Sequence, residues 1–145
     1  MSIKIQKSVI EPYTPAQMFA LVNDVRSYPE FIPHCTKVLI QKEESHLLRA
    51  QVHFKKGFLH HHFTTDNHLF KPDRIEMHLV EGPFKKFSGT WLFQTIPLGC
   101  RVELQLTLDF NNALIQKMLQ PFIETLMHDM IHAFGARAKR IYNPL

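Results

Sequence analysis

Histidines are the residues with the most obvious capacity for chemistry in this 145-residue chain, which contains ten of them. His128 and His132 stand four apart, the spacing at which two side chains share one face of a helix and can bind a metal ion together. Both fall on the polar side of the helix predicted around them, and no glutamate lies between them as in the metalloprotease motif. In the run His60-His61-His62 the side chains would alternate between the two faces of a strand, so they cannot converge on one ion. We therefore expect no metal site.

Catalytic groups are scarce along the rest of the chain. It contains no nucleophile elbow, no phosphate-binding glycine loop and no paired-carboxylate signature. The inward positions of the predicted strands are almost entirely apolar, which leaves no acid or base to serve a reaction in a cavity. Cys35 and Cys100 fit no zinc-binding or redox spacing, so we expect two buried thiols. The chain is therefore expected to be a binding protein, not an enzyme, with no catalytic cofactor.

Composition and charge favour a soluble cytoplasmic protein. Residues 1–10 lack the features of a signal peptide or a presequence, and no run approaches the ~18 apolar residues of a membrane span. The formal net charge of +4 mildly favours acidic partners such as phospholipid or RNA. Twelve phenylalanines favour an aromatic core or a cavity with aromatic walls.

The element that must position these groups is a long amphipathic helix over residues 112–141. Its apolar side chains fall on one broad arc at helical spacing: Ile115, Leu119, Phe122, Ile123, Leu126, Met127, Met130, Ile131, Phe134 and Ile141. Asn112 can cap the first turn, whereas Pro121 predicts either a kink or a separate lead-in helix. No other stretch predicts a helix of comparable length, so the helix must pack on a sheet.

The sheet is expected to begin with a strand over residues 3–9 and to continue after two short helices. Thr14-Pro15-Ala16-Gln17 is a capping box that begins the first helix. Asp24 is expected to cap a further turn, which Pro29 would end. An irregular loop should then cover Tyr28–Cys35.

From residue 36 to residue 110 apolar and polar residues alternate, and short turns separate the segments. This pattern predicts about six strands in an antiparallel meander with one apolar face. We expect an α+β fold in one domain, residues 1–145, in which a curved antiparallel sheet of about seven strands surrounds the long helix.

This layout resembles the helix-grip fold, also called START-like or Bet v 1-like. Specific motifs resemble the coenzyme Q-binding START-domain family: Tyr28-Pro29-x-Phe31-x-Pro33-x-Cys35, Phe63-x-Thr65-x-Asn67, Gly82-Pro83-Phe84, Gly89-x-Trp91-x-Phe93 and Ala133-Phe134-x-x-Arg137-Ala138. The resemblance covers nearly the whole chain. His34 departs from it, because the family usually has tryptophan there, and the run His60–His62 is atypical. The resemblance implies a ligand-binding domain of the polyketide cyclase/dehydrase type.

Aromatic and methionine residues at inward positions are the candidate ligand-binding residues. They are Phe31, Phe54, Phe63, Met77, Phe84, Phe87, Trp91, Phe93, Met130 and Phe134. The candidate cavity mouth consists of Tyr28, Pro29, Pro33, Gly82 and Pro83. Each of these side chains is equally suited to filling the core, and Trp91 is the strongest single candidate because it offers both a flat face and an N–H donor.

The family resemblance implies two functions. The first is non-enzymatic binding of a polyisoprenoid quinone, ubiquinone (coenzyme Q), by a carrier or chaperone of respiration. The alternative is a toxin of a toxin–antitoxin system that binds the large ribosomal subunit and blocks subunit association, as reported for bacterial members of the family.

Two kinds of surface would serve these functions. Phe31 and Phe84 on loops with lysines nearby could touch a membrane, which would place the protein peripherally at the inner membrane during lipid loading. The basic groups Lys55-Lys56, Lys85-Lys86 and Arg137-x-Lys139-Arg140 are candidate ribosome contacts. No feature of the sequence indicates an oligomeric state.

Overall fold

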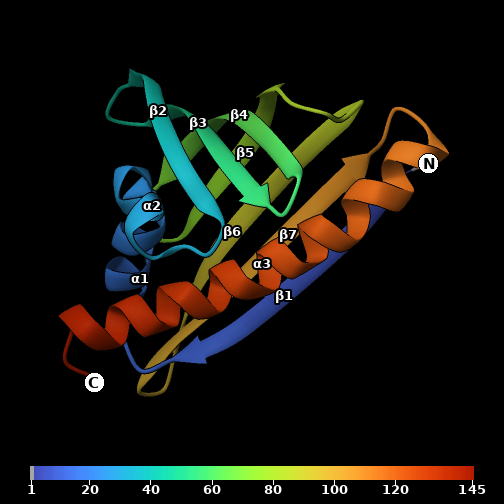
Figure 1. Ribbon diagram of the computed structural model, residues 1–145. Coiled ribbons are helices and arrows are strands. Elements are labelled where there is room, and N and C mark those ends of the chain that lie inside the picture. Colours follow the sequence, from blue (N-terminus) through green and yellow to red (C-terminus); the bar gives the residue numbers. More distant parts are fainter. Residues whose placement is uncertain (1) are drawn as a thin grey trace.

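The computed structural model describes residues 2–145, and within them the chain forms one antiparallel sheet of seven strands gripping a long helix (Figure 1). The elements in chain order are β1 (Ile3–Glu11), α1 (Pro15–Asn23), a 3-10 turn η1 (Val25–Ser27), α2 (Tyr28–Phe31), β2 (Cys35–Glu43), β3 (Leu47–Lys56), β4 (Leu59–Phe70), β5 (Arg74–Glu81), β6 (Lys86–Ile96), β7 (Gly99–Asp109) and α3 (Ala113–Ile141). The strand order is β1-β7-β6-β5-β4-β3-β2. The predicted α+β helix-grip fold is confirmed.

The sheet has one apolar face because apolar and polar side chains alternate along each strand. Neighbouring strands pair so that their apolar residues lie opposite each other. On β7, Val102, Leu104, Leu106 and Leu108 are buried, whereas the residues between them are partly or fully exposed. In the pairing of β6 with β7, Trp91 lies opposite Leu104 and Phe93 lies opposite Val102. Directly opposite residues of antiparallel strands point to the same face, so each pair adds to one continuous inner surface.

Helix α3 runs across this inner surface (Figure 1). Asn112 caps it, its side-chain oxygen accepting a hydrogen bond from the Ile115 N–H at 2.9 Å. The buried residues of the helix are Leu119, Phe122, Ile123, Leu126, Met127, Ile131, Phe134 and Ala138. Ile141, predicted on the apolar arc, is 52% exposed at the helix end.

Pro121 lies inside α3, which is continuous from Ala113 to Ile141. The prediction of a separate lead-in helix is therefore wrong. Pro121 is exposed, so the carbonyl of Lys117 that loses its helical partner can be hydrated by solvent.

The short helices follow the sequence pattern at their start and depart from it later. The capping box is present, with Thr14 Oγ1 accepting from Gln17 N at 3.1 Å and Gln17 Oε1 accepting from Thr14 N at 2.9 Å. The Asp24 side chain does not cap the next turn and instead accepts a hydrogen bond from the Ser27 hydroxyl at 2.6 Å.

Two expectations for this segment are wrong. Pro29 does not end the turn, and only residues 32–34 of the predicted loop Tyr28–Cys35 are irregular. Pro29 lies in the first turn of α2, where its missing N–H would have no helical partner in any case. Cys35 already begins β2.

Both cysteines are buried and unbonded, as expected. Burial raises the pKa of each thiol to about 11. No helix within residues 2–145 combines the length and the apolar character that crossing a membrane requires.

Candidate functional site: an apolar cavity between the sheet and α3

A cavity of about 110 Å³ lies between the inner face of the sheet and α3. Its lining comes from the α1–α2 segment, five strands and α3: Val22, Val25, Tyr28, Ala50, Val52, Phe54, Phe63, Thr65, Asn67, Ile75, Met77, Phe87, Trp91, Leu104, Leu106, Ile123, Leu126, Met127 and Met130. A buried water needs ~10–15 Å³ of such space, so the cavity could hold roughly ten waters or one substituted ring. That volume is below the ~300–1,000 Å³ of typical small-molecule sites.

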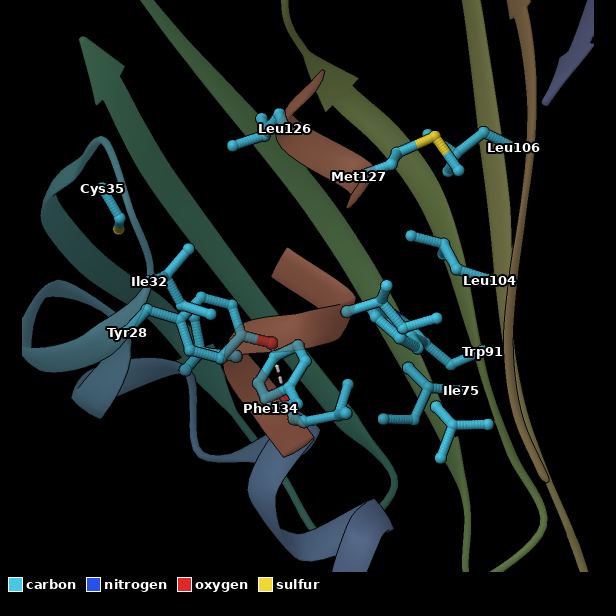
Figure 2. Packing of buried hydrophobic residues seen from close by; sticks show 14 of the residues in the cluster. Tyr28, Ile32, Cys35, Ile75, Trp91, Leu104, Leu106, Leu126, Met127 and Phe134 are labelled. Carbon is cyan, nitrogen blue, oxygen red and sulfur yellow. Dashed lines mark hydrogen bonds between the residues drawn. The ribbon is translucent and has the colours of Figure 1, made fainter. Parts of the chain in front are cut away.

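Trp91 forms one wall of the cavity (Figure 2). It is 3% exposed, and its indole stacks with Phe93 at a centroid distance of 6.4 Å. Phe134 of α3 meets the same indole edge to face at 5.5 Å. Phe93 is in turn covered by Phe19 of α1 at 5.5 Å. Trp91 therefore faces the cavity while Phe93 and Phe134 support it from the sides.

A second aromatic group attaches α2 to α3. The rings of Tyr28, Phe31 and Phe134 lie 5.5 to 6.2 Å apart, each pair edge to face. The Tyr28 hydroxyl donates a hydrogen bond to the Val22 carbonyl, and burial raises the pKa of that phenol. The Arg137 guanidinium lies over the Phe31 ring, 5.0 Å from its centroid. This group closes the cavity beside α2.

Phe84, in the loop between β5 and β6, packs on the inner face of the sheet against two cavity-lining rings, Phe63 and Phe87. Its ring lies 5.3 Å from Phe63, 5.3 Å from Phe87 and 5.6 Å from Phe110, and it is only 6% exposed. A side chain buried in this way cannot touch a membrane unless the loop opens. The structure therefore does not present Phe84 at a loop tip, where the sequence placed it.

The structure brings part of the predicted ligand-binding set together at the cavity. Phe54, Phe63, Met77, Phe87, Trp91 and Met130 line it, together with Tyr28 from the predicted mouth. The predicted residues outside the lining are Phe31, Phe84, Phe93, Phe134, Pro29, Pro33, Gly82 and Pro83. Their aromatic members pack against the walls from behind, Pro29 and Pro33 are exposed, and Gly82 and Pro83 are partly buried.

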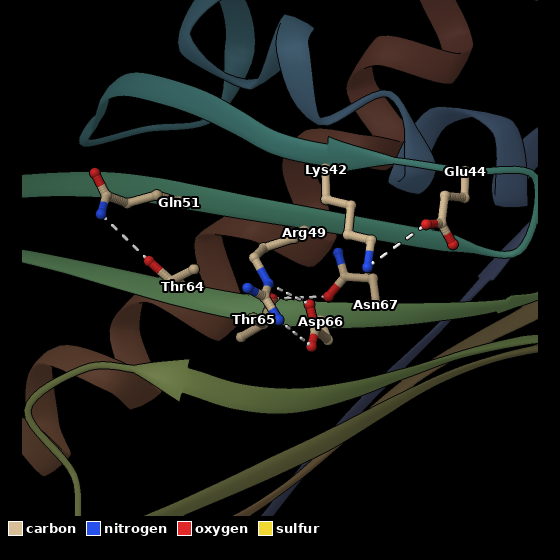
Figure 3. Close-up of polar contacts among 8 residues, drawn as sticks. All are labelled: Lys42, Glu44, Arg49, Gln51, Thr64, Thr65, Asp66 and Asn67. Atoms are coloured by element: carbon tan, nitrogen blue, oxygen red, sulfur yellow. Dashed lines mark hydrogen bonds and ion pairs between the residues drawn. The ribbon is translucent and has the colours of Figure 1, made fainter.

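Sequence reasoning missed the two polar residues of the lining, Thr65 and Asn67. They follow Phe63 at alternate positions of β4, so all three share the inner face. Thr65 Oγ1 donates a hydrogen bond to Asn67 Oδ1 at 2.7 Å, which leaves the Asn67 amide nitrogen as a donor for a ligand oxygen (Figure 3). The same alternation that placed Phe63 inside could have placed both residues there.

Charged groups lie on the convex face of the sheet, away from the cavity. Arg49 holds Asp66 through two hydrogen bonds, Nε to Oδ1 at 2.7 Å and Nη2 to Oδ2 at 2.9 Å (Figure 3). The Arg49 guanidinium lowers the pKa of Asp66. These groups can hold the strands in register, but they cannot act on a molecule inside the cavity.

Histidines lie mainly on outer surfaces. The rings of His128 and His132 are 4.5 Å apart on the exposed side of α3. His53, His60 and His62 gather on the convex face, whereas His61 points inward toward Phe122 at 6.3 Å. In the part of the chain that the structure describes, no group of three or more potential ligands is placed to hold a metal ion.

A curved sheet that grips a helix over a small apolar cavity defines a START-like domain. The chain belongs to the family described as polyketide cyclase / dehydrase and lipid transport, whose pattern matches residues 12–135. The family resemblance inferred from the motifs is thus confirmed.

Relatives in sequence carry two kinds of name. The chain is 39% identical over 143 residues to the ribosome association toxin RatA of Pseudomonas aeruginosa, covering 98% of this chain and 99% of that protein. It is 38% identical over 141 residues to RatA of Escherichia coli K12, covering 97% and 89%. The mitochondrial coenzyme Q-binding protein COQ10 of Drosophila melanogaster is 21% identical over 143 residues, covering 95% of this chain and 59% of that protein.

Similar solved structures support the fold alone. An aromatase/cyclase of Streptomyces sp. R1128 has a TM-score of 0.83 at 20% identity, covering 97% of this chain and 95% of that one. A START superfamily protein of Mycobacterium smegmatis has a TM-score of 0.79 at 15% identity, covering 95% and 98%. The relatives named above carry names of ribosome association and quinone binding, whereas the likeness to a cyclase is one of architecture.

Proposed function

We propose that this protein binds the large ribosomal subunit and hinders its association with the small subunit, as a toxin of the RatA type. The observation that carries the proposal is identity of 36–39% over nearly the full chain to bacterial proteins named ribosome association toxin. This order of preference reverses the one expected from the sequence, where quinone binding came first. A ribosome-binding role would place the protein in the cytoplasm.

The surface is compatible with a partner rich in phosphate. The net charge is +4, and the pairs Lys55-Lys56, Lys85-Lys86 and Lys139-Arg140 are all exposed. Cations that neutralise phosphates release bound counterions, so binding of this kind weakens steeply as salt rises.

Co-sedimentation with separated ribosomal subunits tests the proposal. We expect the purified protein to pellet with the large subunit at about 50 mM salt and to be released at about 200 mM. When it is added before the subunits are mixed, sucrose gradients should show fewer joined ribosomes. Absence of binding to the large subunit at low salt would refute the proposal.

A second candidate function is the binding of a quinone ring, favoured by the apolar cavity with its Thr65–Asn67 polar pair. Burying a ring of ~150–250 Å² contributes roughly 4–6 kcal/mol before the costs of binding. The cavity is about 110 Å³, so a quinone would have to widen it, and an isoprenoid chain would have to lie outside it. The distant similarity to a coenzyme Q-binding protein supports this candidate.

Trp91 offers a direct test because it is the only tryptophan of the chain and lines the cavity. A short-chain ubiquinone should quench its fluorescence in a saturable titration, and mass spectrometry should find quinone in lipid extracted from the purified protein. No saturable quenching and no extracted quinone would remove this candidate and leave the ribosomal one in place.

A further inference from the structure

Five basic or titratable side chains share the convex face of the sheet across β2, β3 and β4. Lys37 of β2 pairs with His53 of β3, His53 pairs with His62 of β4, and Lys55 pairs with His60. Because directly opposite residues of antiparallel strands point to the same face, these side chains form one patch. The His53 ring lies 5.0 Å from that of His62 and 6.0 Å from that of His60.

The neighbours of this patch leave its positive charge largely uncompensated. Glu81 of β5 contributes a carboxylate 3.2 Å from His62 Nε2, and the neutral Gln51 amide hydrogen-bonds His53 at 2.8 Å. Burial and the charges of His62, Lys37 and His60 lower the pKa of His53. Arg49 and Asp66, a cross-strand pair further along β3 and β4, neutralise each other's charge.

The hairpin between β3 and β4 extends the patch to an exposed tip. Gly57 adopts a φ of 61°, in the left-handed region that glycine favours, and makes the turn. Phe58 follows it and is 96% exposed, beside the exposed Lys55 and Lys56. Nothing in the domain covers this ring, although burying it elsewhere would be favourable. An aromatic ring between cations is the combination that single-stranded nucleic acid recognises, because bases stack on the ring while phosphates pair with the cations.

We propose that the β3–β4 hairpin and its histidine patch bind ribosomal RNA, with Phe58 stacking on an unpaired base and Lys55 and Lys56 contacting phosphates. This inference rests on the proposed ribosome association and identifies the surface that performs it. Positive charge suits RNA and an anionic membrane alike, so the choice of RNA rests on the single aromatic ring. A single exposed apolar ring gives little insertion into a bilayer, where binding scales with the apolar area buried.

His53 makes the contact dependent on pH. Its pKa is lowered from 6.5, so it takes up a proton only below that pH, and the added positive charge toward the phosphates should then raise the affinity for RNA. The groups that face the histidines are Lys37 from β2, Gln51 and Lys55 from β3 and Glu81 from β5, and of these Glu81 alone carries the opposite charge. Replacing His53 by glutamine should flatten this dependence.

The test compares hairpin variants with a matched control in two assays: co-sedimentation with the large subunit, and fluorescence anisotropy of a mixed-sequence single-stranded RNA 20-mer. Phe58→Ala should weaken both kinds of binding roughly 5- to 100-fold. The double variant Lys55→Gln/Lys56→Gln should lower the slope of log affinity against log salt by about 1.4 to 1.8, the contribution of two phosphate contacts. The control Lys4→Gln/Lys71→Gln removes two exposed cations away from the hairpin, one on β1 at the opposite edge of the sheet and one just beyond the far end of β4, and should bind like the wild type.

The outcomes separate this inference from the function on which it rests. If the hairpin variants bind the large subunit as the wild type does, the inference is wrong and ribosome association stands. If the wild type binds the RNA through the hairpin but not the subunit, the RNA surface stands and the proposed function falls. If Phe58→Ala no longer binds phosphatidylglycerol vesicles but binds the subunit and the RNA as the wild type does, the hairpin contacts a membrane and the inference is wrong. Absence of wild-type binding to both subunit and RNA would overturn both.

Discussion

The indole of Trp91 and the ring of Phe134 meet edge to face, 5.5 Å between centroids, at the place where the sheet and α3 pack together. Trp91 faces the cavity, whereas Phe134 is completely buried behind it. Earlier in the same helix, Met127 and Met130 line the cavity. The wide apolar face of α3 therefore serves two purposes, packing on the sheet through Phe134 and forming a cavity wall through the methionines.

Phe134→Ala should lower the free energy of unfolding by about 3–5 kcal/mol, because it leaves a void that Trp91, Tyr28 and Phe31 cannot all collapse to fill. Urea denaturation monitored by circular dichroism measures the change. Phe58→Ala is the control, since a ring that is 96% exposed should alter stability by less than about 0.5 kcal/mol. Losses of equal size in the two variants would contradict the role given to Phe134.

His61 should make the protein less stable as pH falls below neutrality. Its pKa is lowered from 6.5, first by burial and then by the charges of His60 and His62. Below pH 6.5 the unfolded chain therefore takes up a proton before the folded protein does, and the free energy of unfolding decreases until pH passes the folded pKa. We expect His61→Phe, which can pack on Phe122, to reduce the slope of the urea midpoint between pH 7.5 and 5.5.

Two comparisons isolate this effect. Burial raises the pKa of Glu11, which acts in the opposite direction, but its contribution is common to the variant and the wild type and cancels between them. Asp66→Asn removes a carboxyl whose pKa Arg49 lowers from 3.8, so it should lower stability by a constant amount between pH 7.5 and 5.5 and leave the slope in that range unchanged. An unchanged slope in His61→Phe would show that the ring is hydrated in the folded protein.

Local patterns were enough to predict the fold. β4 spans Leu59–Phe70 within the alternating region, and the residues that bound it, Gly57 and Lys71-Pro72-Asp73, are turn signals local to the sequence. The capping box at Thr14 is likewise contained in four consecutive residues. The prediction at Pro29 was wrong because a proline can either end one helix or occupy the first turn of the next. Which of the two occurs depends on how α2 packs against β2.

The cavity could be predicted only in part, because which inward side chains border empty space depends on contacts between distant segments. Trp91 and Phe93 share one face of β6, yet Phe19 of α1 covers Phe93 and leaves Trp91 at the cavity. Phe84 was expected to bind the ligand, but three other phenylalanines surround it and it does not line the cavity. Thr65 and Asn67 were missed because aromatic and methionine residues alone were taken as candidates.

The polar pair should matter for ligand binding and little for stability. Asn67→Leu with Thr65→Val removes the amide donor and its hydroxyl partner together, and replacing both partners of a hydrogen bond by apolar groups of similar shape can be nearly neutral. If a quinone carbonyl accepts a hydrogen bond from Asn67, the double variant should bind short-chain ubiquinone about tenfold more weakly, the effect of a bond worth ~1.4 kcal/mol. Quenching of Trp91 measures the affinity, and an unchanged affinity would show that the pair does not contact the ligand.

Gly89→Ala should separate cavity binding from ribosome association. Gly89 lies on the inner face of β6, and a Cβ there would come within 2.6 Å of Leu106 Cδ2 and 2.7 Å of Met77 Cε. Both atoms are ends of flexible side chains that line the cavity, so the added methyl should push them into the empty space.

We therefore expect Gly89→Ala to abolish quenching of Trp91 by short-chain ubiquinone while co-sedimentation with the large subunit stays at the wild-type level, because Phe58, Lys55 and Lys56 of the hairpin do not line the cavity. Gly57→Ala is the companion variant, since no atom lies within 4 Å of its added Cβ but its φ of 61° strains the hairpin turn. It should show the reverse result, normal quenching and weaker binding to the subunit. If Gly89→Ala weakens ribosome binding as strongly as it weakens quenching, the two functions share one conformational requirement and are not independent.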